Sequence, residues 1–150
     1  MTALRYRLWL IIAALAVGCS SPPPAVDVTL EGVGIGYTVS QVKAQLGTPK
    51  VDESTKTEQL FLFSSEDGFN IRATFRDDKL VMLTGQKLTI DGKAYLPGTP
   101  MDEFKTLLGE HDERKVRWAG WEQLIWNRKK TAIKVVFRKN EMASAELELI

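Results

Sequence analysis

The sequence has little of what enzymes and disulfide-bonded secreted domains usually carry. Its 150 residues include one cysteine, Cys19, and one histidine, His111. One cysteine cannot form an internal disulfide, and one histidine without a second histidine or cysteine does not make a typical zinc site. The chain also has no nucleophile elbow, phosphate-binding loop or metalloprotease helix. We therefore expect no catalytic residues, no metal and no cofactor, and we predict that the protein is not an enzyme.

An excess of charge of one sign is also missing. Without Arg5 and Arg7, which belong to a predicted signal segment, 18 of the 20 basic residues remain against 19 acidic ones, a net charge of −1. That balance does not support a nucleic-acid partner. Nothing in the sequence indicates a small-molecule substrate.

The apolar run at residues 8–17 has ten residues, whereas a membrane-spanning helix needs about 20. Basic residues before the run and small residues after it are typical of a secretory signal. The "AVGC" that ends at Cys19 resembles a bacterial lipobox, with Ala16 where leucine is usual. This resemblance implies cleavage before Cys19 and attachment of lipid, including palmitate, to that cysteine. An ordinary cleaved signal with an incidental cysteine is the alternative.

The residues after the cysteine predict a location and a tether. Ser20, in place of aspartate, favours the outer membrane, facing the periplasm, by resemblance to lipoprotein sorting in Gram-negative bacteria. The run "SSPPP" favours an extended chain without core residues. We therefore divide the chain into a signal peptide (1–18), a lipidated cysteine with a proline-rich tether (19–29), and two repeats (30–90 and 91–150).

The two repeats match at a fixed offset of 62 residues without a gap. "FNIRATFRDDKL" at residues 69–80 corresponds to "TAIKVVFRKNEM" at residues 131–142. The matching pairs in the preceding segments are Gly36 with Gly98, Val42 with Phe104, Lys43 with Lys105, Leu46 with Leu108, and Gly47 with Gly109.

Each repeat is predicted to begin with a short helix. Thr38 and Gln41 have the spacing of a capping box, and Thr99 has the same place in the second repeat. Gly47 and Gly109 follow the last apolar residue of each helix and are expected to end it.

Alternating apolar residues and short polar turns then predict strands near residues 58–63, 69–75, 80–90, 116–126, 131–137 and 143–149. The expected fold class is α+β, with two tandem repeats. Each repeat is a short helical segment followed by a three-stranded antiparallel β-meander, with the helices on one face of the sheet. The sequence leaves open whether the two repeats share one continuous sheet.

The stretch "IGYTVSQVKAQLGTP" at residues 35–49 resembles the opening signature of the SmpA/OmlA, or BamE-like, outer-membrane lipoproteins. The residues that carry the resemblance are Gly36, Thr38, Val42, Leu46, Gly47 and Pro49. The tandem arrangement is similar to that of β-lactamase inhibitory protein, in which paired helix-plus-sheet repeats form a concave surface that grips another protein. These resemblances imply a lipid-anchored envelope protein with a protein partner.

Three tryptophans, Trp118, Trp121 and Trp126, fall within nine residues of the second repeat. In an unbroken strand Trp118 and Trp126 would share one face and Trp121 the other, whereas a turn at Ala119-Gly120 would change this. One interpretation is that they fill the core. The other is that at least one anchors a partner, with Arg117 nearby on a polar rim.

The hairpin "SSEDGF" at residues 64–69 is a second candidate, because it combines an acidic residue with an aromatic one. The candidate partner-binding residues are therefore Trp118, Trp121, Arg117, Asp67 and Phe69. We expect a lipid-anchored, non-catalytic scaffold or binding module of the cell envelope that makes protein–protein contacts, in outer-membrane assembly or maintenance. The alternative is a periplasmic inhibitor or sensor that binds one soluble partner through a concave sheet face.

Overall fold

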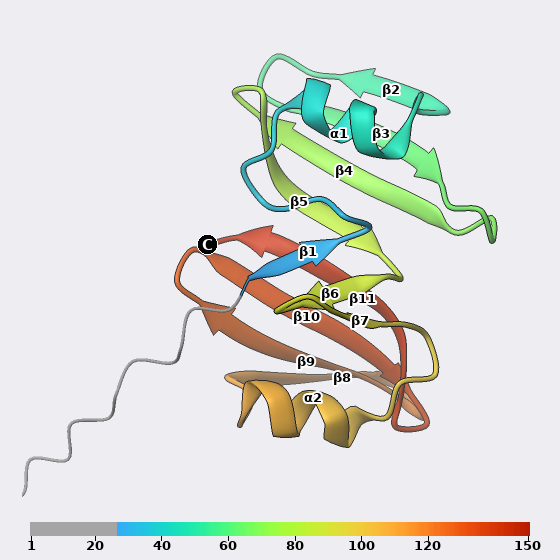
Figure 1. Ribbon diagram of the computed structural model, residues 1–150, viewed down its shortest axis with the longest axis vertical. Helices are drawn as coiled ribbons and strands as arrows, with labels where there is room; N and C mark the ends of the chain where they lie inside the picture. The colour runs from blue at the N-terminus through green and yellow to red at the C-terminus, as the bar shows by residue number, and fades with distance from the viewer. Residues whose placement is uncertain (1–26) are drawn as a thin grey trace, which may run out of the picture.

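A computed structural model describes residues 27–150 (Figure 1). The predicted signal, Cys19 and most of the tether lie outside the described residues. Within residues 27–150, no helix is long and apolar enough to cross a membrane. The elements there are β1 (Val28–Leu30), α1 (Val39–Leu46), β2 (Val51–Ser54), β3 (Gln59–Ser64), β4 (Asn70–Arg76), β5 (Lys79–Gly85), β6 (Leu88–Ile90), β7 (Lys93–Tyr95), α2 (Met101–Leu108), β8 (Glu113–Trp118), β9 (Trp121–Arg128), β10 (Thr131–Arg138) and β11 (Glu141–Leu149).

Eight of these strands form one antiparallel sheet in the order β2-β3-β4-β5-β11-β10-β9-β8. The join between the two halves is the β5–β11 pair, in which Leu83 lies opposite Leu147. The halves therefore share one continuous sheet. A second, three-stranded sheet has the order β1-β6-β7 and lies between α1 and α2 (Figure 1).

Side chains alternate between the two faces of the large sheet, as its period of two requires. In β4, Ile71, Ala73 and Phe75 are buried, whereas Asn70 and Arg72 are exposed. Buried residues of the six inner strands, β3, β4, β5, β11, β10 and β9, join one apolar cluster with residues of α1, α2 and the small sheet. We call this side of the large sheet the core face and the opposite side the open face.

The predicted fold class is wrong. The chain is mostly β, since the two helices have eight residues each while eleven strands occur within residues 27–150. Each half contributes four strands to the large sheet instead of three, and the layer over the core face includes a second sheet rather than helices alone. The physical reason is that turns divide two long apolar segments, residues 80–90 and 116–126, which sequence analysis treated as single strands.

The offset of 62 residues between the halves reappears in the hydrogen bonds. The Gly36 N–H donates to the Leu80 carbonyl at 2.9 Å, and the Gly98 N–H donates to the Met142 carbonyl at 2.8 Å. The register of the β4–β5 pair shifts between residues 74 and 75 of β4. The register of the β10–β11 pair shifts at the equivalent place, between residues 136 and 137 of β10.

The ends of the helices agree with the sequence at three of four positions. The Thr38 side chain accepts from the Gln41 N–H, and the Gln41 side chain accepts from the Thr38 N–H, so the capping box is confirmed. Gly47 and Gly109 end their helices with φ of 85° and 75°. The expected cap at Thr99 is wrong, because α2 begins after Pro100, and the Thr99 hydroxyl donates to the Leu96 carbonyl instead.

Replacing Gly47 or Gly109 with valine is expected to lower the free energy of unfolding by about 2 kcal/mol each. Both glycines combine positive φ with ψ of −153° or −160°, a region that is essentially restricted to glycine. Urea unfolding followed by far-UV circular dichroism measures the loss. Ala44→Val, at an exposed position inside α1, introduces the same side chain and is expected to cost under about 1 kcal/mol. Equal losses of unfolding free energy at Gly47 and Ala44 would mean that the positive φ at Gly47 does not require glycine.

Candidate protein-binding surface

The β8–β9 hairpin brings two of the candidate tryptophans together. The chain turns at Ala119-Gly120, where Gly120 has a φ of 76°, so Trp118 and Trp121 lie opposite each other in the ladder. Their ring centroids are 5.7 Å apart. Trp118 is 61% exposed and Trp121 is half-buried. The turn alternative is therefore confirmed, and the unbroken strand is wrong.

The third tryptophan belongs to the core. Trp126 is fully buried, and its indole Nε1 donates to the Gly109 carbonyl at 3.0 Å. The ring of His111 meets it edge-on at 6.4 Å between centroids. His111 is thus half-buried beside Trp126. Within residues 27–150 no group of three or more histidine, cysteine, aspartate and glutamate residues could hold a metal ion.

Two guanidinium groups flank the paired tryptophans. Arg138, from β10, lies over the Trp121 ring with its Cζ 5.4 Å from the ring centroid, a cation–π geometry. Arg117 donates to the Gln123 side chain at 3.0 Å. Neither arginine forms an ion pair with a carboxylate of the described residues. We call Arg117, Trp118, Trp121 and Arg138 the Trp–Arg cluster.

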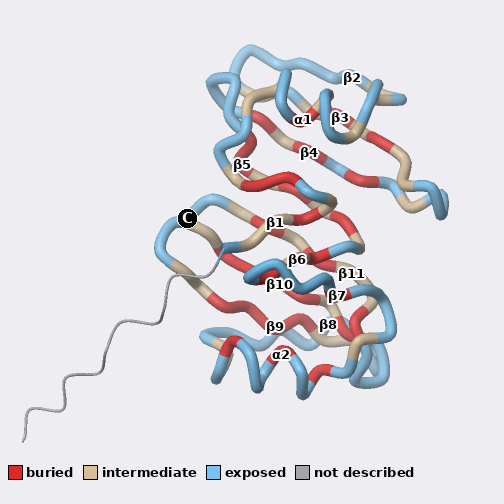
Figure 2. Tube along the Cα trace, viewed as in Figure 1, coloured by how far each residue is buried: buried red, intermediate tan, exposed pale blue. Residues whose placement is uncertain are grey.

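The strand that leads into this cluster is unusual in its exposure. All six residues of β8 are exposed (Figure 2), and Val116 and Trp118 expose 70% and 61% of their surface. β8 is the outermost strand of the large sheet, with β9 as its one neighbour. Large apolar side chains exposed on a sheet edge are a typical feature of an interaction site.

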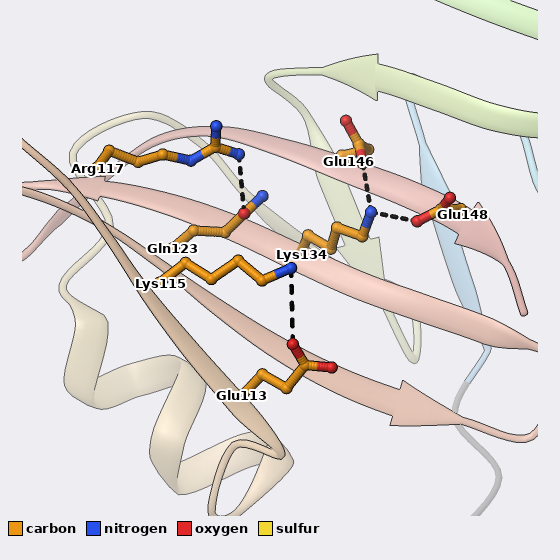
Figure 3. A network of polar contacts seen from close by, with 7 residues as sticks. All are labelled: Glu113, Lys115, Arg117, Gln123, Lys134, Glu146 and Glu148. Atoms are coloured by element: carbon orange, nitrogen blue, oxygen red, sulfur yellow. Dashed lines mark hydrogen bonds and ion pairs between the residues drawn. The ribbon is translucent and has the colours of Figure 1, made fainter.

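The open face of the second half carries a polar network next to the cluster (Figure 3). Lys134 of β10 forms ion pairs with Glu146, at 2.7 Å, and with Glu148. Burial by itself would lower the pKa of Lys134. The hydrogen bonds with the two glutamates and their negative charge outweigh it and raise the pKa of Lys134 above its ordinary value of 10.5.

This pKa direction predicts a dependence of stability on pH. Because folding raises the pKa of Lys134, its stabilising contribution is fully present below pH 10.5 and is lost as the pH rises through the folded-state pKa. Lys134→Met is expected to cost about 1 kcal/mol at pH 8, since the pair is partly exposed to water, and less at pH 11.5.

Urea unfolding at both pH values measures this change. The matched control is Lys130→Met, because Lys130 is exposed and forms no ion pair within residues 27–150. A cost at Lys134 that is the same at both pH values would mean that its aliphatic stem, not its charge, stabilises the fold.

The second candidate, the hairpin between β3 and β4, lies elsewhere. Asp67 is exposed there, and Phe69 is half-buried against the core. Asp67 lines a groove of about 750 Å³ between this hairpin and the loops next to the small sheet. Three strands separate β4 from β9 in the large sheet, a distance of about 19 Å at the usual strand spacing. The structure therefore does not bring Asp67 and Phe69 together with the Trp–Arg cluster.

Two residues of the site were not predicted from the sequence. Val116 is the most exposed large apolar residue of those described, and Arg138 covers Trp121. Arg138 lies four residues after Lys134 in β10, so alternation alone places both on the open face. That signal would have identified Arg138 once Trp121 was assigned to the same face.

Comparisons with known proteins identify a fold and no family. No protein-family model matches the chain, and no curated protein matches it. Similar solved structures include an extracellular protein containing an SCP domain from Bacillus anthracis, with a TM-score of 0.57 and 11% identity over 76% of this chain and 43% of that one. A cysteine-rich secretory protein from Staphylococcus aureus gives a TM-score of 0.53 and 10% identity over 77% and 44% of the two chains. A DUF4309 family protein from Bacillus subtilis gives a TM-score of 0.51 and 10% identity over 75% of this chain and 78% of that one.

These identities show a shared fold alone. The chain spans less than half the length of the first two structures. One of these two structures is described as extracellular and the other as secretory. An extracellular or envelope location of this chain is consistent with both descriptions. The resemblance to BamE-like lipoproteins and the lipid anchor stay predictions from the sequence.

Proposed function

We propose that this protein is a lipid-anchored, non-catalytic binding module of the bacterial cell envelope, in outer-membrane assembly or maintenance. It contacts its protein partner through the β8–β9 hairpin. The observation that carries the proposal is the exposure of Val116 and Trp118, at 70% and 61%, on the edge strand of the sheet.

The composition of the hairpin supports a protein partner. Tryptophan and arginine are the residues most enriched at the energetic centres of protein interfaces. The Trp–Arg cluster presents two of each, and its two arginines have no ion pair with a carboxylate of residues 27–150. An approaching carboxylate can therefore bind either guanidinium in the bidentate manner without first displacing a carboxylate of residues 27–150.

The anchor is tested by Cys19→Ser. The lipobox interpretation predicts that the thiol of Cys19 carries the lipid, so the variant is expected to take up no labelled palmitate in growing cells. The control is the native protein with the conservative change Ser20→Thr, which keeps the thiol. Uptake of label by Cys19→Ser would contradict the lipobox interpretation, and a native protein without label would favour the ordinary-signal alternative.

The proposed function is tested by crosslinking and capture from intact cells. The native protein is compared with Trp118→Ala/Trp121→Ala and with the control Leu96→Ala/Leu107→Ala, which removes exposed apolar side chains elsewhere. We expect membrane-assembly components with the native protein and the control, and their loss with the tryptophan variant. Identical partners with all three proteins would contradict the assignment of the site.

A second candidate is an inhibitor or sensor of one soluble periplasmic protein. The observation that favours it is the β5–β11 pair, which makes the open face continuous across both halves. Half-exposed Leu60, Leu62 and Met82 lie on that face of the first half. Capture of one soluble, stoichiometric protein, lost with Leu62→Arg rather than with the tryptophan variant, would favour this function.

A further inference from the structure

The outer edge of β8 has free backbone groups. β8 is last in the strand order and pairs with β9 alone, and no further backbone hydrogen bond joins residues 113–118 to the rest of the described chain. An antiparallel strand points about half of its N–H and C=O groups toward each side. The side of β8 away from β9 therefore offers a row of donors and acceptors to an incoming strand.

The opposite edge of the large sheet, β2, is protected from pairing with another strand. β2 has four residues, of which Asp52, Glu53 and Ser54 are exposed and polar, and Val51 is half-buried. Short length and charge are devices that prevent edge pairing. β8 has six residues and adds exposed Val116 and Trp118 to its charges. Charged side chains alone would protect the β8 edge from pairing with another strand, whereas the exposed Val116 and Trp118 favour such pairing.

The charge of β8 selects among extended segments. Its cations are Arg114, Lys115 and Arg117, and its one carboxylate is Glu113. Arg114 is paired with Glu122 at 2.6 Å, and Lys115 lies 3.6 Å from Glu113. Arg117 has no such ion pair, and neither has Arg138 beside it on the open face. A basic segment would be repelled here, whereas an acidic one would find two available guanidinium groups.

We infer that the partner contributes an extended acidic segment, which adds to β8 as a ninth strand of the large sheet. This inference rests on the proposed function and names the chemistry of the partner. The six residues of β8 span about 20 Å, so they pair with a segment of similar length. Backbone hydrogen bonds provide affinity, and alternate side chains provide specificity. On the open face, carboxylates pair with Arg117 and Arg138 beside Trp118. On the other face, apolar side chains pack on Val116, which lies opposite Glu122.

The test uses the protein purified from membranes in detergent and an eight-residue peptide of alternating glutamate and valine. Hydrogen–deuterium exchange of residues 113–118 is measured by mass spectrometry with and without peptide at millimolar concentration. We expect amide exchange in this segment to slow at least tenfold. The lysine–valine peptide and the acidic peptide N-methylated at every residue, which blocks both of its edges, are expected to give no protection.

Two variants refine the result. Arg117→Glu/Arg138→Glu is expected to weaken binding of the acidic peptide at least tenfold, while Lys56→Glu/Lys87→Glu, which reverses two exposed cations elsewhere, leaves it unchanged. No binding of the acidic peptide, or binding without protection of residues 113–118, would overturn the inference. Protection that grows with protein concentration in the absence of peptide would also overturn it, since a second copy, through its acidic β2 edge, would then be the occupant.

The capture experiment above separates this inference from the proposed function. If partners depend on Trp118 and Trp121 but the acidic peptide fails, the binding site stands and the ninth strand does not. If the captured partners do not depend on the tryptophans, the proposed function fails whatever the peptide does.

Discussion

Replacing Trp126 with alanine is expected to lower the free energy of unfolding by about 3–5 kcal/mol. The indole is fully buried, so its removal leaves a cavity in the core between β9 and the end of α2. It also removes the donor to the Gly109 carbonyl, which lies just past the last turn of the helix. A domain of this size is usually stable by about 5–15 kcal/mol, so the loss is a large fraction of the total.

Urea unfolding followed by far-UV circular dichroism measures this effect without relying on tryptophan fluorescence. Trp118→Ala is the matched control, because it removes the same side chain from a position that is 61% exposed. We expect it to cost under about 1 kcal/mol. Similar losses for the two variants would contradict the division into a core tryptophan and a surface tryptophan.

Trp118→Ala is expected to weaken the complex with the proposed envelope partner by about 30-fold or more. An interface hot spot of 2 kcal/mol or more corresponds to a change in Kd of that size. The stability of the free protein should change little, because Trp118 contacts the half-buried Trp121 at the surface. Isothermal titration calorimetry with the isolated partner measures the Kd.

Leu107→Ala provides the comparison for this prediction. Leu107 lies on α2, is 39% exposed and takes no part in the Trp–Arg cluster. We expect the Leu107→Ala variant to bind the partner with a Kd within about twofold of the native value. An equal loss of affinity at Leu107 would contradict the assignment of the interface to β8 alone.

Much of the fold could be predicted where local pattern and final environment agree. β4 alternates along its whole length, with buried Ile71 and Phe75, and β10 alternates from Ile133 to Arg138, with buried Ile133 and Phe137. Sequence alternation therefore located both strands to within a residue. Capping at Thr38 was equally local, since the two side chains of the box are three residues apart.

The missed strands lack such a pattern. β2 reads "VDES" and has one apolar residue, because it is an exposed edge held by backbone pairing to β3. β1, β6 and β7 have three residues each, too few to show a period. β1 depends on long-range pairing, with Val28 opposite Ile90, which the local sequence does not encode. β6 and β7 pair with each other across the turn at Asp91 and Gly92.

The candidate site was predictable in part for the same reason. The sequence gathered Trp118 and Trp121, but their mutual contact depends on the turn with positive φ at Gly120. The contribution of Arg138 depends on the β9–β10 register, in which it lies opposite Trp121. Asp67 and Phe69 were predicted as a second candidate for binding, and three intervening strands separate them from the cluster.

The measurement that tests the central claim most directly is site-specific photocrosslinking in living cells. A photoreactive amino acid replaces Trp118 in one strain and Leu107 in another, and crosslinked products are identified by mass spectrometry. The account predicts an envelope protein crosslinked at position 118 and absent at position 107, with the crosslinked peptide of the partner being acidic and extended. Crosslinks at position 107 alone, or at neither position while the protein still binds its partner, would contradict the assignment of the β8–β9 hairpin as the binding surface.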